Sequence, residues 1–214
     1  MVWDYAANYV DYMQFYNDYN SFKPNLLRYK EMGAVHLYKE FASTNVYPFA
    51  NMRTYIFGKL SWDLDENISE LIDKFMPQYY KDAAPYVREY FDFIINYWAA
   101  HDAELGHNFH ANNATGKGID DWPRNIVDKS LALLDKALVA ANNMQDKKLG
   151  EIVYKRVLEE KLSMATQKLE NYSAYGYNQD EYTIYVASYK KMVEDTEAIE
   201  YSQYKTFAEF LKTY

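Results

Sequence analysis

The chain has 214 residues and a formal net charge of −8, from 23 basic and 31 acidic side chains. No block of Lys or Arg interrupts this acidity, which argues against nucleic acid and anionic membrane surfaces as partners. The sequence has no cysteine, so disulfides, thiolate chemistry and cysteine-ligated zinc are excluded. It is 18% aromatic, with 24 Tyr, and its 7 Gly and 5 Pro are too few for a many-turned β sandwich, which favours long helices.

The first forty residues predict a short unit of strand, helix and strand. Residues 34–38 have the apolar character of a buried strand, and residues 1–5 are a candidate for a second strand. Between them, residues 23–33 predict a short helix, because Pro24 lies near its start and Gly33 lies just past its end. The arrangement is βαβ-like, so we expect the two strands to be parallel.

From Tyr47 onward the sequence has the period of amphipathic helices. The first helix ends at the break over residues 61–63, Asn67 caps the next one while Glu70 reaches back to it, and Pro85 opens a third. The apolar faces expected for these helices are Met52, Tyr55, Ile56 and Leu60; Ile68, Leu71, Ile72, Phe75 and Tyr79; and Val87, Tyr90, Phe91, Ile94, Ile95 and Trp98.

The second half predicts a loop and then further helices. Residues 105–121 are rich in Gly and Asn, and Asp121 or Trp122 is expected to cap a helix that reaches Met144. More helices are expected over residues 149–171, with Ile152 among the inward residues, and over residues 182–196 and 201–211. Short connections of this kind favour an antiparallel bundle.

The fold class predicted is therefore mainly α, an antiparallel helical bundle preceded by a short βαβ-like unit. The expected division is residues 1–63 for the βαβ and first helix, 64–105 for linking helices, 106–121 for a loop, and 122–214 for the C-terminal bundle.

Three of the four histidines lie close together, between His101 and His110. Their intervals of six and three residues match no standard zinc pattern, so we favour a polar helix end that runs into a loop; a metal site is the weaker alternative. The chain also lacks a Gly-x-Ser-x-Gly elbow, and Gly116-Lys117-Gly118 does not make a phosphate-binding loop. No metal and no cofactor is predicted.

Tyrosine beside tryptophan and carboxylates is a combination with which proteins bind sugars, since rings stack on apolar sugar faces and carboxylates accept from hydroxyls. Trp3-Asp4-Tyr5 at a strand end is the best local example, and Tyr9, Tyr12, Phe15, Tyr16 and Tyr19 follow it. Most of the 24 tyrosines need no such role, because a half-buried ring with a solvated hydroxyl is the simpler explanation.

Several blocks of the sequence resemble the bacterial glycosidase-like proteins classed as domain of unknown function 4838. The resemblance covers about residues 1–170, and its most specific blocks are Lys59 to Asp63 and Tyr79 to Tyr86. The blocks are Trp3-Asp4-Tyr5, Pro24-Asn25-Leu26, Met32-Gly33, Tyr55 to Asp63, Glu70 to Asp73 and Tyr79 to Tyr90.

The resemblance implies a likeness to α-glucuronidases, in which a (β/α)₈ barrel leads into a C-terminal helical region. Trp3-Asp4-Tyr5 would then end the seventh barrel strand, residues 34–38 would be the eighth, and the first six strands would be missing. Active sites of such barrels draw on several strands, so this chain alone would not assemble one. The family analogy also implies uronic-acid or plant-glycan ligands and an extracytoplasmic location for the parent proteins.

One departure from the family pattern affects catalysis. Lys39 stands where a family carboxylate is expected, and Glu40 follows it. Glycoside hydrolysis normally uses two carboxylates on either side of the bond, and with Asp4 as the only other candidate no catalytic pair is assigned. The predicted substrate-binding residues are Trp3, Asp4, Tyr5, Lys39 and Glu40.

The resemblance therefore implies the C-terminal part of a carbohydrate-active protein, which completes or supports a sugar-binding cleft without catalysing a reaction by itself. Its expected partners are a glycan and the missing barrel portion. The alternative is a non-enzymatic helical interaction module that binds a protein partner or a second copy of the chain, because a partial barrel exposes strand edges and apolar faces.

Overall fold

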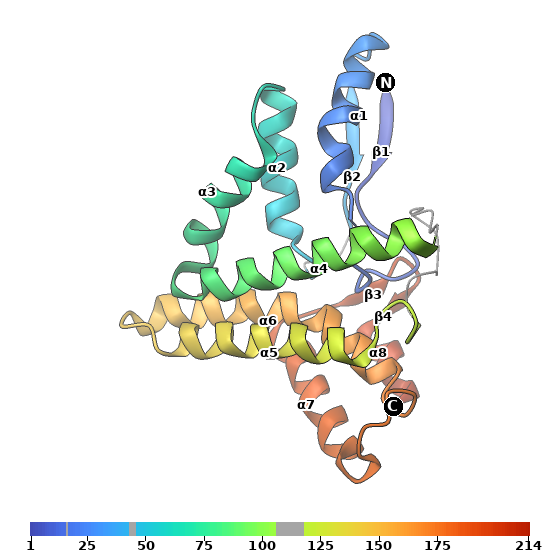
Figure 1. The fold of residues 1–214 in the computed structure, drawn as a ribbon, viewed down its shortest axis with the longest axis vertical. Helices are drawn as coiled ribbons and strands as arrows, with labels where there is room; N and C mark the ends of the chain where they lie inside the picture. Colours follow the sequence, from blue (N-terminus) through green and yellow to red (C-terminus); the bar gives the residue numbers. More distant parts are fainter. Residues whose placement is uncertain (16, 43–45, 106–117) are drawn as a thin grey trace.

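The computed structural model describes residues 1–15, 17–42, 46–105 and 118–214, and it confirms the predicted fold class. The protein is mainly α, with 65% helix, and it begins with a short parallel βαβ unit (Figure 1). In chain order the elements are β1 (Val2–Tyr5), α1 (Tyr19–Glu31), β2 (Leu37–Glu40), α2 (Ala50–Trp62), α3 (Ile68–Tyr80), α4 (Ala84–Leu105), α5 (Arg124–Asn142), α6 (Lys147–Glu170), α7 (Tyr182–Asp195), β3 (Glu200–Ser202), β4 (Lys205–Thr206) and α8 (Phe207–Phe210), with single 3₁₀ turns at Lys81–Ala83, Gln179–Glu181 and Leu211–Thr213.

The two N-terminal strands are parallel, as predicted, with Val2 opposite Leu37 and Tyr5 opposite Glu40. β2 begins three residues later than expected. Gly33 ends α1 in the left-handed conformation, at φ 71°, and the chain needs residues 34–36 to return to the strand direction.

α1 begins at Tyr19, four residues before the predicted start. Tyr19 and Phe22 are both buried, so tertiary packing extends the helix toward the N-terminus. Pro24 consequently lies in the second turn rather than in the first.

Asn67 caps α3 as predicted, because its side-chain oxygen accepts from the backbone N–H groups of Ser69 and Glu70. The return contact expected from Glu70 is not among the hydrogen bonds of the part of the chain that the structure describes. The Glu70 carboxylate instead lies 4.0 Å from the Lys74 ammonium, one turn further along the exposed side of the helix.

α4, α5 and α6 lie across the middle of the molecule, and α5 and α6 run antiparallel after a short connection (Figure 1). Gly150 of α6 lies so close to α5 that a Cβ atom there would be 2.7 Å from the carbonyl oxygen of Ala141. The prediction that Ile152 faces inward is wrong: it is 49% exposed, because α6 turns Gly150 and Val153 toward the core instead.

The expected caps of α5 are also wrong. The N-cap position is Pro123, which has no side chain that could accept a hydrogen bond, while Trp122 is buried and stacks on Trp98 with ring centroids 5.0 Å apart. Burial of its ring fixes Trp122 in the core. The predicted loop over residues 106–121 lies almost entirely outside the described residues.

The helix predicted over residues 201–211 is wrong in its first half. β3 and β4 form an antiparallel hairpin there, and α8 begins only at Phe207, where Thr206 and Glu209 form a capping box. The hairpin meets the N-terminal segment through its backbone, since Tyr12 donates to the carbonyl of Tyr201 and Gln203 donates to that of Tyr9. In the interior of a helix the backbone groups of Tyr201 and Gln203 would bond within the helix and would not be available to Tyr9 and Tyr12.

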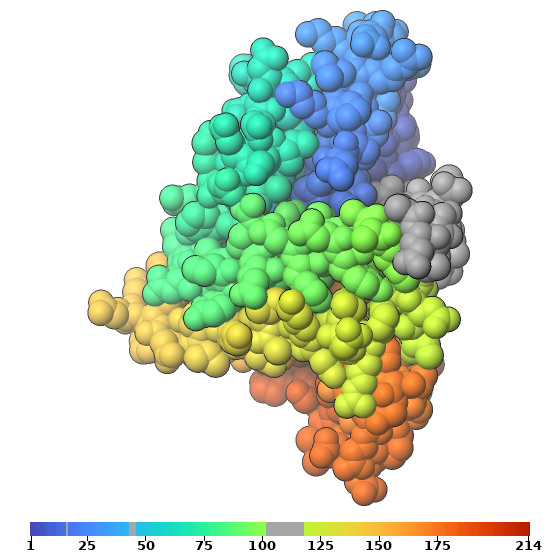
Figure 2. Space-filling view, viewed as in Figure 1, coloured from blue at the N-terminus to red at the C-terminus, as the bar shows by residue number. Residues whose placement is uncertain are grey.

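The N-terminal and C-terminal parts pack against each other through one continuous core. The Ser163 hydroxyl of α6 donates to the carbonyl oxygen of Met13 at 2.6 Å. In the space-filling view α4 lies between the βαβ unit with α2 and α3 on one side and the α5 to α7 helices on the other (Figure 2). Among the described residues no helix is both long enough and apolar enough to cross a membrane.

Candidate functional site

The five predicted site residues all lie at the C-terminal ends of β1 and β2, where the parallel pairing brings them together. Trp3 is opposite Tyr38, Asp4 is opposite Lys39, and Tyr5 is opposite Glu40. Because successive side chains of a strand point to opposite sides of the sheet, the pairing also divides the set. Asp4 and Lys39 lie on the side of α1 and α2, whereas Trp3, Tyr5, Tyr38 and Glu40 lie on the other side, which we call the open face.

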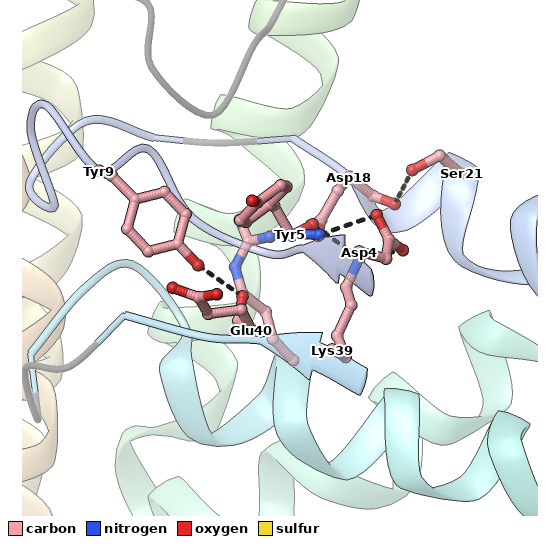
Figure 3. Close-up of polar contacts among 8 residues, drawn as sticks. Asp4, Tyr5, Tyr9, Asp18, Ser21, Lys39 and Glu40 are labelled. Atoms are coloured by element: carbon pink, nitrogen blue, oxygen red, sulfur yellow. Dashed lines mark hydrogen bonds and ion pairs between the residues drawn. The ribbon is translucent and has the colours of Figure 1, made fainter. Parts of the chain in front are cut away.

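On the helix-facing side Lys39 is enclosed. Its ammonium lies 2.8 Å from an Asp4 carboxylate oxygen and donates to the Tyr5 carbonyl at 2.8 Å, and its side chain is 3% exposed (Figure 3). The ammonium also lies 5.2 Å from the ring centroid of Phe22 in α1 and 5.8 Å from that of Phe57 in α2. Burial lowers the pKa of Lys39, and the Asp4 carboxylate opposes that effect.

The Asp4 carboxylate is also engaged by neighbouring groups. Besides Lys39, its carboxylate accepts from the backbone N–H of Tyr5 at 2.8 Å. Burial together with the Asp4 carboxylate raises the pKa of Tyr29 in α1 to about 12. Asp4 and Lys39 therefore hold the strands to the helices, and neither presents a free group to a ligand.

The open face is aromatic and carries one carboxylate. Trp3, Tyr38 and Tyr5 are 55%, 51% and 45% exposed. The Trp3 indole N–H donates to Glu40 Oε2 at 2.7 Å, and the rings of Trp3 and Tyr38 meet edge to face with centroids 4.8 Å apart. Trp3 thus fixes the Glu40 carboxylate beside the exposed rings.

Tyr38 belongs to this face although it was not among the predicted site residues. The sequence contains the signal that would have found it, since Tyr38 and Glu40 are two positions apart in one strand and must share a side. The interpretation of residues 34–38 as a buried strand obscured that signal, because it treated Tyr38 as core.

Most of the aromatic residues that follow the first strand lie in the core. Tyr9, Tyr12, Phe15 and Tyr19 are all buried, and Tyr16 lies outside the described residues. The Tyr9 ring meets that of Tyr5 edge to face with centroids 5.5 Å apart. The Tyr9 hydroxyl donates to the backbone carbonyl of Glu40 at 2.8 Å, a contact drawn in Figure 3. Tyr9 therefore supports the end of β2 and does not line the open face.

Asp4 and Glu40 cannot act as a catalytic pair. Glycosidase carboxylates must lie on either side of one glycosidic bond, at the same end of a cleft. Here the two carboxylates lie on opposite sides of the sheet, and Asp4 is held by Lys39. What the open face offers is ring surface for stacking and one acceptor group.

The histidine cluster is described only in part. His101 stacks on Tyr97 with ring centroids 5.2 Å apart, and its Nε2 lies 3.9 Å from an Asp121 carboxylate oxygen. His107 and His110 lie outside the described residues. Within the described ranges no group of three or more His, Asp or Glu side chains is placed to hold a metal ion.

A surface hollow of about 490 Å³ between α2, α3 and α6 is a second candidate, because it is lined by Tyr79 and by Glu159. Burial raises the pKa of Glu159 to about 7. The Tyr79 ring already has close neighbours, however: the Arg156 guanidinium lies 4.0 Å from its centroid, and Phe75 stacks on it at 4.9 Å. This ring is not free to stack on a ligand.

The comparison with protein families bears on the part of the chain that carries the open face. Residues 1–92 match the family described as Domain of unknown function (DUF4838). The match contains β1, β2 and all the predicted site residues, but it ends before α5, whereas the resemblance seen in the sequence extended to about residue 170. No solved structure and no functionally described protein matches the chain.

Proposed function

We propose that this protein contributes one side of a carbohydrate-binding cleft in a glycosidase-like protein, with its helices supporting that side, and that it does not catalyse a reaction by itself. The observation that carries the proposal is the open face, where Trp3, Tyr5 and Tyr38 are exposed around a Glu40 carboxylate that Trp3 holds in place.

The chemistry of this face suits a sugar. A pyranose ring has apolar C–H surfaces that stack on aromatic rings, and hydroxyl groups that donate hydrogen bonds. Trp3 Nε1 occupies one carboxylate oxygen of Glu40, which leaves the other oxygen as an acceptor for a sugar hydroxyl. Hydrogen bonds to an ionised carboxylate are about twice as strong as those between neutral groups.

The position of the face in the βαβ unit also supports the proposal. In (β/α)₈ barrels the helices pack outside, and ligands bind at the C-terminal ends of the strands. The open face is the side of the strands away from α1, and Tyr5 and Glu40 are their last residues. The link to glycosidases rests on family analogy and is part of the proposal.

Glycan-array binding tests this function. The double substitution Trp3→Ala and Tyr5→Ala removes two exposed rings, and we expect apparent glycan affinity to fall about tenfold or more, from lost stacking. Trp62→Ala is the matched control, because Trp62 is 93% exposed at the end of α2 and should not affect binding. Binding that survives the double substitution would contradict the proposal.

The alternative, an interaction module, is favoured by one specific observation. Within the described residues β1 and β2 form a sheet of two strands, so each has an outer edge that another strand could extend. Under this hypothesis the protein self-associates or captures a partner strand. Light scattering across a concentration series tests self-association, and a strict monomer would count against it.

A further inference from the structure

We infer that the open face selects neutral sugars and discriminates against uronates, an inference that rests on the proposed function and specifies its ligand class. The three charged side chains at the ends of β1 and β2, Asp4, Lys39 and Glu40, do not all lie on the same side of the sheet. Glu40 is on the open face, whereas Lys39, the one cation among the predicted site residues, is on the opposite side of the sheet.

Lys39 is not available to a ligand carboxylate. Its side chain is 3% exposed, and its ammonium is engaged by Asp4 and by the Tyr5 carbonyl, each at 2.8 Å. To reach a ligand on the open face it would have to break both contacts and leave the rings of Phe22 and Phe57. The opposite charges of Asp4 and Lys39 also neutralise each other on the helix-facing side of the sheet.

Among the described residues that form the open face, Glu40 is the one with a carboxylate. Its Oε2 atom accepts from the Trp3 indole, which places the carboxylate beside the ring on which a sugar would stack. A uronate stacked there would bring a second carboxylate close to the first. Because like charges at such distances repel even in water, we expect about fivefold weaker binding than for the matched neutral sugar.

His36 directly precedes β2 and lies at the other end of the strands from Glu40. Its carbonyl accepts from the N–H of Val2, whereas Glu40 is opposite Tyr5. His36 is four residue steps from Glu40 along an extended chain, a distance of about 13 Å.

The geometry also limits the shape of the ligand. The rings of Trp3 and Tyr38 are inclined at 64° to each other, so they cannot both lie flat against one planar surface. A single sugar unit or a soluble chain fits this arrangement, and a crystalline polysaccharide surface does not.

The test compares matched pairs of methyl pyranosides that differ only at C6: glucoside with glucuronoside, galactoside with galacturonoside, and mannoside with mannuronoside. Binding is followed by NMR titration of the full chain at pH 8 and low salt. We expect the neutral member of a pair to bind about fivefold more tightly, and the difference to shrink as salt screens the repulsion.

Glu40→Gln sharpens the test. Glutamine keeps an oxygen that accepts from the Trp3 indole but removes the charge, so the preference for the neutral sugar should largely disappear. Glu89→Gln, which removes the same charge from an exposed position on α4, is the matched control and should leave the preference unchanged.

The outcomes separate the two hypotheses. Uronates that bind as tightly as their neutral partners, or more tightly, overturn this inference while the carbohydrate function stands. If no pyranoside and no array glycan binds, the proposed function fails and the inference fails with it. The salt dependence is measured on the unmodified chain, so the test holds even if Glu40→Gln does not fold.

Discussion

At the residue scale, Lys39 does not belong to the open face, but its contacts hold in place the two strands that carry that face. Its ammonium binds Asp4 of the neighbouring strand and the carbonyl of Tyr5, while its stem lies against Phe22 and Phe57. It thereby joins β1 to β2 and both strands to α1 and α2. Because Tyr5 and Glu40 end these strands, the position of the open face depends on this contact.

Lys39→Met tests that role. Methionine retains the apolar stem but leaves the Asp4 carboxylate, 20% exposed, without its ammonium partner. We expect the free energy of unfolding in urea to fall by about 1–3 kcal/mol, the usual cost of an unpaired, largely buried polar group. Adding Asp4→Asn removes the stranded charge and should recover part of the loss. If Lys39→Met alone is as stable as the original protein, the ion pair contributes little to the free energy of unfolding.

At the element scale, the contact between α5 and α6 depends on a helical glycine. A Cβ atom on Gly150 would lie 2.7 Å from the Ala141 carbonyl oxygen and 3.4 Å from the Cβ of Met144. Gly58 of α2 is the contrasting case, since a Cβ atom there meets nothing within 4 Å. Comparing the two positions distinguishes the effect of close helix packing on stability from the effect of the greater backbone freedom of glycine, which destabilises any helix.

We expect Gly150→Ala and Gly58→Ala to have opposite effects on the urea midpoint. The first forces α6 away from α5 and should destabilise the protein by about 1–3 kcal/mol. The second exchanges glycine for a better helix former in open space and should stabilise it by up to about 1 kcal/mol. Equal effects of the two substitutions would mean that α5 and α6 do not approach as closely as described.

At the scale of the whole molecule, Glu160 links three elements in the core. Its Oε2 accepts from the N–H of Phe49, which precedes α2, and its Oε1 accepts from the Tyr80 hydroxyl at the end of α3, both at 2.7 Å. Phe49 has φ 57°, so the bond to Glu160 holds a strained residue at the start of a helix. The carboxyl group therefore connects α6 to the N-terminal half of the molecule.

Burial raises the pKa of Glu160 from its usual 4.5 to about 8 and outweighs the hydrogen bonds from Tyr80 and Phe49, which favour the ionised form. Between these values the folded state holds a proton that the unfolded chain has released. Stability from this group is therefore full below pH 4.5 and is lost as pH rises toward 8. The free energy of unfolding should fall by up to about 1.4 kcal/mol per pH unit in that window.

Urea titrations between pH 4.5 and 8 check this slope in the original protein and in Glu160→Gln, which should be less sensitive to pH. Glu159→Gln is the matched control. Burial raises the pKa of Glu159 as well, to about 7, but this side chain is partly exposed, so its removal should change the slope less. If Glu160→Gln leaves the slope unchanged, Glu160 is not the cause of the pH dependence of stability.

Local patterns in the sequence were sufficient for most helices of the fold. The period of apolar residues located α2 to α7 to within a few residues, and Asn67 marked the start of α3 by its side chain alone. Both signals act within one or two helical turns, so neighbouring residues are enough to express them. The division of the chain into four segments stays a prediction.

The local patterns failed where distant segments compete. Residues 200–206 form a hairpin because their backbone bonds to Tyr9 and Tyr12, nearly two hundred residues earlier. Ile152 is exposed although its period placed it inside, because the close approach of Gly150 to α5 sets the rotation of α6. The sequence of residues 200–206 does not indicate that Tyr9 and Tyr12 are its partners. The sequence of α6 likewise does not indicate how closely it approaches α5.

The candidate site was determined in the same two stages. The βαβ pattern predicted that the ends of the two strands lie side by side, and the resemblance to the family selected Trp3, Asp4, Tyr5, Lys39 and Glu40 there as candidate site residues. Only the tertiary structure decided which of them a ligand could meet. The alternation of side chains defines two sides of a sheet, but α1 and α2 cover one of them, enclosing Lys39 with Asp4 and leaving the aromatic side with Glu40 open.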